Sequence, residues 1–266
     1  MGERLKGKVA LITGCGSSGP GWGNGKAMSV LFAREGASVF GCDIQQASAE
    51  ETRDLATSEG ADMAVMQCDV ADDTQVAAVV SECVARYGRI DVLVNNVGIA
   101  NLGGVVDCPL EDWQKAWAVN VTSMFLMCKY VVPHMLHQGS GSIVNIGSVA
   151  GIRDSGVAYV SYSTTKAATL GLSRSVALQY AAQNIRSNVI LPGLMHTPMV
   201  AEHLKAGYGV GSKEAMLDKR SKQCPMGRMG DAWDVAHAAL WLASDDSKYV
   251  SAAEIVVDGG LTAKFA

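Results

Sequence analysis

The sequence has no long hydrophobic run, although hydrophobic residues make up 48% of its 266 residues. No uninterrupted apolar stretch approaches the ~20 residues that cross a bilayer, so we expect no membrane-spanning helix. The charged start MGERLKGK leads directly into a short apolar segment, and no export-signal cleavage site follows. These absences predict a soluble, cytoplasmic protein.

Basic residues are also scarce: 22 Lys and Arg stand against 26 Asp and Glu, which gives a net charge of −4. No basic face is evident, so nucleic acid is not an expected partner. The cysteines form no C-x-x-C pair and no zinc-ligand spacing, and His134 and His137 lack a third ligand nearby in sequence. We therefore predict buried free thiols and no metal site, the cysteines being Cys15, Cys42, Cys68, Cys83, Cys108, Cys128 and Cys224.

Two kinds of segment alternate along the whole chain. Short β-branched runs are typical of strands buried on both faces, and they cover 8–13, 37–43, 63–69, 90–96, 142–148, 186–192 and 253–260. Longer segments with apolar residues at helical spacing cover 25–35, 46–59, 73–87, 110–138, 158–182 and 231–244. Several follow residues that commonly cap helices, namely Asn24, Asp72 and Asp231.

This alternation predicts an α/β fold: one doubly wound Rossmann domain over residues 1–266, with a parallel seven-stranded sheet covered by helices on both faces. Residues 194–226 fall outside the alternation. Ligands bind at the carboxyl ends of the strands in such folds, so we interpret this segment as a substrate lid. This segment suits either a partly apolar pocket or helices that pack on a core, because it contains Met195, Met199, His203, Leu204, Tyr208 and Met216.

A glycine-rich turn follows the first predicted strand. Gly14, Gly16 and Gly19 form a literal G-x-G-x-x-G, a weak signal alone that gains weight between a buried strand and a helix. Glycine lets a pyrophosphate approach backbone N–H groups at a helix start. Because Pro20-Gly21-Trp22 cannot begin a helix, we expect the phosphate-facing turn at Gly23-Asn24-Gly25.

Asp43, at the end of the second predicted strand, bears on the choice of cofactor. A carboxylate there accepts hydrogen bonds from the adenosine ribose hydroxyls and repels the 2′-phosphate of NADP. The following Ile44-Gln45-Gln46 provides no arginine for a phosphate, although Lys26 could partly compensate. The sequence thus favours NAD.

A second motif combines Ser148 with Tyr162 and Lys166. Tyr and Lys four residues apart share a helix face, so the ammonium is expected to lower the phenol pKa from ~10 toward neutrality. Tyr162 then becomes a proton donor and acceptor, and Ser148 at a strand end can hydrogen-bond a substrate oxygen. This constellation predicts proton transfer coupled to a reaction of the nucleotide.

Over essentially its full length the chain resembles the short-chain dehydrogenase/reductases. The shared motifs are Thr13-Gly14, Asp69-Val70, Asn95-Asn96-Val97-Gly98, Asn120, Ser148, Tyr162 with Lys166, Pro192-Gly193 with Thr197, and Asp258-Gly259-Gly260. Together with Asp43, the resemblance implies an NAD-dependent oxidoreductase that interconverts a secondary alcohol and a ketone, and the family usually forms a homotetramer.

It also implies roles for individual residues. Asp69 and Val70 would contact the adenine, and Asn96 and Gly98 the adenosine and ribose side. Lys166 would also bind the nicotinamide ribose. Further cofactor contacts would come from Gly14, Gly23, Asn24, Gly25, Ile44, Tyr162, Pro192 and Gly193, with Thr197 on the carboxamide and Asn120 holding a water in a proton relay.

The chain departs from the family pattern in three places. Eight residues separate Gly14 from Gly23 where three are usual, Val97 replaces an alanine, and Ser148 stands fourteen residues before Tyr162, one more than is common. None of these changes removes a functional group. The longer turn leaves the path of the phosphate cradle open.

Three alternatives remain at this point. Tyr159 stands seven residues before Lys166, the spacing of enoyl-thioester reductases, which also have a longer glycine turn. A 3-oxoacyl carrier-protein reductase would share the scaffold, but it would usually need NADP and a basic docking surface. A non-catalytic nucleotide sensor would have lost Tyr162 or Lys166. The sequence does not separate cyclic alcohols, sugars, steroids and hydroxy acids as substrates.

Overall fold

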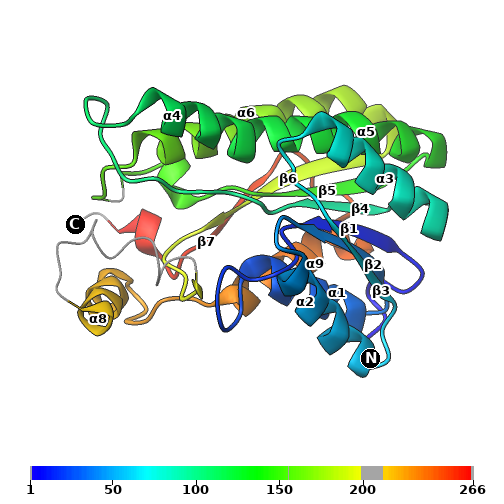
Figure 1. Ribbon diagram of the computed structural model, residues 1–266, viewed down its shortest axis with the longest axis horizontal. Helices are drawn as coiled ribbons and strands as arrows, with labels where there is room; N and C mark the ends of the chain where they lie inside the picture. Colours follow the sequence, from blue (N-terminus) through cyan, green and yellow to red (C-terminus); the bar gives the residue numbers. More distant parts are fainter. Residues whose placement is uncertain (1, 155, 199–211, 265–266) are drawn as a thin grey trace.

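Seven parallel strands form one sheet in a computed structural model that describes residues 2–154, 156–198 and 212–264 (Figure 1). The strand order is β3-β2-β1-β4-β5-β6-β7, and every neighbouring pair is parallel. The strands are β1 (Val9–Thr13), β2 (Ser38–Asp43), β3 (Met63–Gln67), β4 (Val92–Asn95), β5 (Gly141–Ile146), β6 (Ile185–Pro192) and β7 (Glu254–Val257). The predicted doubly wound sheet is confirmed.

Helices cover both faces of the sheet (Figure 1). One face carries α1 (Asn24–Arg34), α2 (Gln46–Ser58) and α9 (Ala232–Ala243), and the other α3 (Asp73–Tyr87), α4 (Leu110–Trp117), α5 (Ser123–Gln138) and α6 (Val160–Tyr180). Two apolar cores result: Met28 and Leu240 are buried in one, Met127 and Ile143 in the other. Because both faces are covered, the central strands read as continuous apolar runs, as predicted from the sequence.

The helix starts depend on specific caps. Asp72 accepts hydrogen bonds from the backbone N–H groups of Thr74 and Gln75, and Asp231 completes a capping box with Asp234. The prediction that Asn24 caps the first helix is wrong, because Gly23 holds the cap position and Asn24 is the first helical residue. The Asn24 side chain is thus left to face the adjacent pocket.

The long predicted helix 110–138 contains a π-helical turn. Residues Ala118–Thr122 form this turn between α4 and α5, and Asn120 lies buried in it. Such turns displace a side chain from the regular helical position and occur often at functional sites. Short 3-10 turns cover Val149–Gly151, Ala181–Gln183, Asp245–Ser247 and Leu261–Ala263.

The strand order reverses between β1 and β4, which are neighbours in the sheet and pair through residues such as Ala10 and Val92. From β1 the sheet continues through β2 and β3 on one side and through β4 to β7 on the other. Ligands bind at such a switch point, beyond the carboxyl ends of the strands. On one side Asp43 ends β2 and Asp69 follows β3, and on the other side Ser148 follows β5 and Pro192 ends β6.

Of the predicted lid, residues 199–211 lie outside the described residues, and with them Met199, His203, Leu204 and Tyr208. The described part of the segment includes α8 (Lys213–Gln223) and a β-bridge between Met195 and Gly230. All seven cysteines are free, and six are buried. No helix among the described residues is both long and apolar enough to span a membrane.

Candidate active site

A cavity of about 800 Å³ lies at the carboxyl edge of the sheet. Of the residues predicted for the site, Asn120 alone does not line it. The cavity wall includes Gly14, Gly23, Asn24, Gly25, Asp43, Ile44, Asp69, Val70, Asn96, Gly98, Ser148, Tyr162, Lys166, Pro192, Gly193 and Thr197. Residues from Gly14 to Thr197 therefore meet in one space large enough for a dinucleotide and a small substrate.

The glycine-rich turn depends on close backbone contact. Gly14 has a φ of +63°, and its carbonyl oxygen accepts a hydrogen bond from Asn96 Nδ2 at 3.0 Å. A Cβ on Gly25 would lie 1.7 Å from the same carbonyl oxygen. Glycine at position 25 is therefore what allows α1 to approach the end of β1.

We expect Gly25→Ala to unfold this turn locally. The methyl group overlaps backbone atoms that cannot move aside, so the free energy of unfolding should fall by about 2–4 kcal/mol and nucleotide affinity by more than tenfold. Gly171→Ala is the matched control, because Gly171 lies on α6 with nothing within 4 Å of a Cβ. That change should be neutral or stabilising by about 0.5–1 kcal/mol. Urea denaturation and nucleotide titration of both variants test this, and equal behaviour would contradict it.

The longer turn is held by contacts on both sides. The Gly16 N–H donates to Asp43 Oδ2 at 3.0 Å, and the Ser17 N–H donates to Ser48 Oγ of α2 at 2.7 Å. The Trp22 ring lies against Trp233 of α9, with centroids 4.7 Å apart. Trp22 thus packs against α9, while Gly16, Ser17 and Ser18 of the longer turn line the cavity together with Gly14, Gly23 and Gly25.

The end of the cavity near β2 and β3 fits an adenosine. Each Asp43 oxygen accepts one backbone hydrogen bond, from Gly16 or Gln45, so each has a lone pair left for a ribose hydroxyl. Asn24 Oδ1 is buried with no hydrogen-bond partner, an acceptor that a ligand group could satisfy. Lys26 forms an ion pair with Glu51 instead of turning to the ribose position. These residues fit NAD. Because Lys26 is paired with Glu51, it does not provide the positive charge that could have balanced the 2′-phosphate of NADP.

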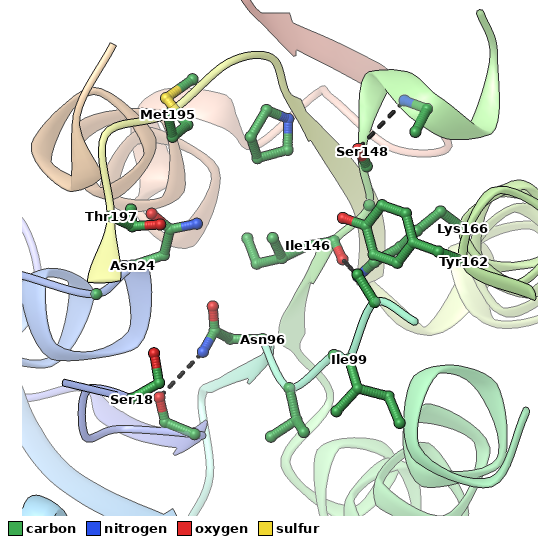
Figure 2. Close-up of a pocket in the computed structure, with 18 of the residues that line it drawn as sticks. Ser18, Asn24, Asn96, Ile99, Ile146, Ser148, Tyr162, Lys166, Met195 and Thr197 are labelled. Atoms are coloured by element: carbon green, nitrogen blue, oxygen red, sulfur yellow. Dashed lines mark hydrogen bonds between the residues drawn. The ribbon is translucent and has the colours of Figure 1, made fainter. Parts of the chain in front are cut away.

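The opposite wall of the cavity carries the proton-transfer residues. Figure 2 shows Ser148, Tyr162 and Lys166 together, across the cavity from Asn24 and Thr197. Lys166 Nζ lies 5.7 Å from the centre of the Tyr162 ring, so the two side chains share a face of α6 as predicted. Ser148 follows β5, and its hydroxyl accepts the Ala150 N–H at 3.2 Å.

The pKa of the Tyr162 phenol is raised, and not lowered toward neutrality as predicted. Burial raises the pKa of Tyr162 to about 12, while the Ser148 hydroxyl and the Arg220 charge act to lower it. Lys166 Nζ donates to the backbone carbonyl of Ile146 at 2.8 Å. The prediction of a phenol pKa near neutrality is therefore wrong for this arrangement, because desolvation outweighs the charges around the phenol.

Lys166 itself is 3% exposed, and burial lowers its pKa to about 8. Asn120 lies behind it: Oδ1 accepts the Ile99 N–H at 2.8 Å, and Nδ2 donates to the Ile99 carbonyl at 2.9 Å. A Cβ on Gly98 would meet Lys166 Nζ at 3.0 Å and Asn120 Oδ1 at 3.5 Å. Glycine at 98 therefore keeps open the space between the lysine and the asparagine.

We expect Lys166→Met to stabilise the fold. Since the unfolded chain holds this lysine proton more tightly than the folded one, the buried charge costs about 3 kcal/mol at pH 7. The cost shrinks as pH rises from 8 to 10.5, because in that range the folded state has already lost the proton. Urea denaturation at pH 7 and pH 10 should show the advantage of Lys166→Met at pH 7 and a smaller one at pH 10. A variant less stable than wild type at pH 7 would contradict this.

Tyr159 does not take the position that faces Lys166. It holds the N-cap position of α6 and is 9% exposed, and its ring lies edge-on to Tyr162 at a centroid distance of 5.3 Å. Its backbone forms a bridge with Gly103. Both tyrosines line the cavity, but Tyr162 is the one whose ring lies by the ammonium.

Several lining residues were not identified from the sequence. Arg153, Arg220 and Lys264 line the cavity, and so do Leu261 and Thr262 from the turn after β7. In the sequence, Arg220 is one of several charged residues on a polar helix, so no local signal distinguishes it. Of the apolar residues assigned to the pocket, Met195 lines it, whereas Met216 packs in a small core with Tyr159.

The architecture and the site together define a Rossmann-type oxidoreductase. The family model described as enoyl-(acyl carrier protein) reductase matches residues 21–262. A crystal structure of a putative short-chain dehydrogenase/reductase from Burkholderia xenovorans superposes with a TM-score of 0.93 at 47% identity, covering 99% of this chain and 100% of that one. The chain belongs to the short-chain dehydrogenase/reductase family.

Curated relatives match along nearly the whole chain. A 3-oxoacyl-(acyl-carrier-protein) reductase of Thermotoga maritima is 38% identical over 97% of this chain and 99% of its own length. A 2,5-dichloro-2,5-cyclohexadiene-1,4-diol dehydrogenase of Sphingobium indicum is 36% identical over 98% of both chains. The relatives are thus oxidoreductases, and their named substrates differ from one another.

Proposed function

We propose that this protein is an NAD-dependent dehydrogenase that reversibly oxidises a secondary alcohol to a ketone. One observation carries the proposal: a single cavity joins the Asp43 carboxylate at one end to Ser148, Tyr162 and Lys166 at the other. The first group suits a ribose without a 2′-phosphate, and the second suits proton exchange with a substrate oxygen. The dehydrogenase relative supports the same reaction class.

Asp43 would hold the adenosine ribose of a bound NAD, which would supply the hydride acceptor and, in its oxidised form, a positive charge. Tyr162 takes the hydroxyl proton in oxidation and returns it in reduction. Ser148 donates or accepts a hydrogen bond at the same oxygen, and it holds that oxygen within reach of the phenol. The raised phenol pKa of Tyr162 means that positive charge near the ring is needed for the phenolate to form.

Lys166 supplies part of that charge from the adjacent helix turn. Below its pKa of about 8 it is an ammonium, held at the Ile146 carbonyl and able to reach a ribose hydroxyl in the cavity. Asn120 fixes the backbone at Ile99 through two hydrogen bonds. We propose that this leaves room for a water that carries the proton from Lys166 to solvent. We also propose that the other predicted cofactor contacts, among them Gly14 and Thr197, bind the same nucleotide.

The first experiment is NADH formation at 340 nm from purified protein, NAD and a panel of secondary alcohols, with NADP alongside. We expect turnover with NAD and a lower rate with NADP. Turnover with NADP alone would contradict the cofactor assignment. No turnover in either direction, with NAD binding shown separately, would contradict the dehydrogenase assignment.

Enoyl reduction is the second candidate, since the matching family model is described by that activity and Tyr159 lies in the cavity wall. A trans-2-enoyl thioester with NADH tests it directly. The retained Ser148 and the position of Tyr162 beside Lys166 favour the carbonyl reaction. A 3-oxoacyl thioester belongs in the same panel because of the Thermotoga relative.

Two further proposals concern the protein as a whole. The family resemblance supports a homotetramer, which light scattering of the purified protein can test. Seven free cysteines support a reducing, cytoplasmic location. Segment 194–226 is proposed to act as a substrate lid, with α8 forming part of the cavity wall through Arg220 and Gln223.

A further inference from the structure

A buried hydroxyl group joins two helical segments behind the cavity wall. Thr165 lies on α6, and its side chain is fully buried. Its Oγ1 accepts a hydrogen bond from Nδ2 of Asn120, in the π-helical turn, at 2.9 Å. The same hydroxyl donates to backbone carbonyl oxygens one turn earlier on α6, at 2.8 Å to Ser161 and at 2.9 Å to Tyr162. Thr165 therefore ties the π-helical turn to the helix turn that carries the Tyr162 phenol.

Asn120 extends this link to the segment that follows β4. Its Oδ1 accepts the Ile99 N–H, and its Nδ2 donates to the Ile99 carbonyl. Both hydrogens of the amide nitrogen are then engaged, one by Ile99 and one by Thr165, whereas Oδ1 keeps a second lone pair. Ile99 lines the cavity on the side of Tyr162 and Lys166 (Figure 2). The Thr165 hydroxyl is thus one of three contacts that fix the direction of the Asn120 amide.

The amide oxygen of Asn120 lies near the space that Gly98 keeps open. One point in this space, the place that a Cβ on Gly98 would take, is 3.0 Å from Lys166 Nζ and 3.5 Å from Asn120 Oδ1. A water at that point would lie within reach of both polar groups. Because a hydrogen bond weakens steeply as it bends, the direction of the Asn120 amide decides how well Oδ1 can hold such a water.

We propose that Thr165 is a positioning residue of the proton-transfer path: its hydroxyl holds the Asn120 amide so that Oδ1 faces the water-sized space beside Lys166. The inference rests on the proposed dehydrogenase function and adds a residue to it. Thr165 does not line the cavity, so it acts through Asn120 and not on the substrate or the nucleotide. Without the hydroxyl, a buried Asn120 N–H loses its acceptor, and the amide is held less firmly.

Variants of α6 separate the hydroxyl from the rest of the side chain. Thr165→Val has nearly the same shape and lacks the hydroxyl, whereas Thr165→Ser keeps the hydroxyl and lacks the methyl group. Thr165→Ala removes the same hydroxyl without adding a methyl group, and it replaces Thr165→Val if that variant does not fold. Thr169→Val is the matched control, because Thr169 is fully buried one turn later on α6 and its hydroxyl donates to the Lys166 carbonyl at 2.7 Å.

Amide hydrogen exchange tests the link without any turnover. The Ile99 N–H donates to Asn120 Oδ1, so its exchange rate reports how firmly the amide is held. We expect Thr165→Val to raise this rate by about tenfold or more, and Thr165→Ser and Thr169→Val to change it by less than about threefold. The rate at Val94 in β4 corrects for changes in overall stability. Equal exchange at Ile99 in wild type and Thr165→Val would overturn the proposal.

Steady-state kinetics connect the link to the reaction. We expect Thr165→Val to lower kcat by about tenfold or more, to change the KM values by less than about threefold, and to raise the solvent deuterium isotope effect on kcat. Thr165→Ser should restore most of kcat. Equal losses in Thr165→Val and Thr169→Val, or a loss in KM alone, would overturn the proposal. No turnover in wild type would contradict the dehydrogenase function, and exchange at Ile99 would still support or overturn the hold of Thr165 on Asn120.

Discussion

Replacing Tyr162 by phenylalanine should lower kcat by about 10³-fold or more while nucleotide affinity changes by less than about threefold. The phenol oxygen is the proposed proton acceptor and donor, and general acid–base catalysis of this kind contributes about 10²–10⁴-fold. The ring of Tyr162 packs against Tyr159 at 5.3 Å, and phenylalanine preserves that contact. Initial rates at saturating substrate and a separate NADH titration measure the two effects.

Tyr159→Phe is the matched control for this prediction. Tyr159 lies three residues away in the same cavity wall, at the cap of α6 instead of beside Lys166. We expect removal of the Tyr159 hydroxyl to change kcat by less than about tenfold. If Tyr159→Phe abolished turnover and Tyr162→Phe did not, the proton-transfer role would pass to Tyr159, and the enoyl-reductase alternative would gain support.

Removing the Asp43 carboxylate should change the cofactor preference. In Asp43→Ala we expect the Kd for NAD to rise by about 30-fold and the preference for NAD over NADP in kcat/KM to fall by about 10²-fold. Two charge-assisted hydrogen bonds to the ribose are lost, and so is the repulsion of a 2′-phosphate. Initial rates and binding titrations with both nucleotides measure these changes.

Asp43 also supports the protein itself, because it accepts the N–H groups of Gly16 and Gln45. Asp43→Asn is therefore the second variant: it has nearly the same shape, retains one acceptor and loses the charge. We expect it to relax the discrimination against NADP with a smaller loss of stability than Asp43→Ala. Unchanged discrimination in a folded Asp43→Asn protein would refute the role of the charge.

Much of the fold could be predicted because the faces on which an element is buried determine the spacing of its apolar residues. β1 and β4 are covered on both faces, so all their residues are buried and all except Thr13 and Asn95 are apolar, and the helices between strands keep one apolar stripe. Asp72 and Asp231 could be identified as caps because a carboxylate satisfies helix N–H groups locally. Asn24 was misassigned because Gly23 ends the loop in extended backbone, one residue earlier than expected.

The predicted site residues could be found because strand ends and turns place them at one edge of the sheet. Motifs such as Gly23-Asn24-Gly25 and Tyr162 with Lys166 are short and local, so spacing alone relates their side chains. The ionisation of Tyr162 could not be predicted in this way. Its pKa depends on how far the surrounding chain removes the phenol from water, and that is a property of the assembled cavity.

The sequence by itself determined the parallel sheet, the order of its elements, the glycine turn and the pair Tyr162 and Lys166, since each depends on residues close together in the chain. Only the tertiary structure decided that Lys26 pairs with Glu51 and that Arg220 is buried in the cavity wall. Side chains from distant segments share a space only after the sheet and its crossovers have formed. Burial and charge in that space, which set pKa values and substrate preference, therefore have no local signature in the sequence.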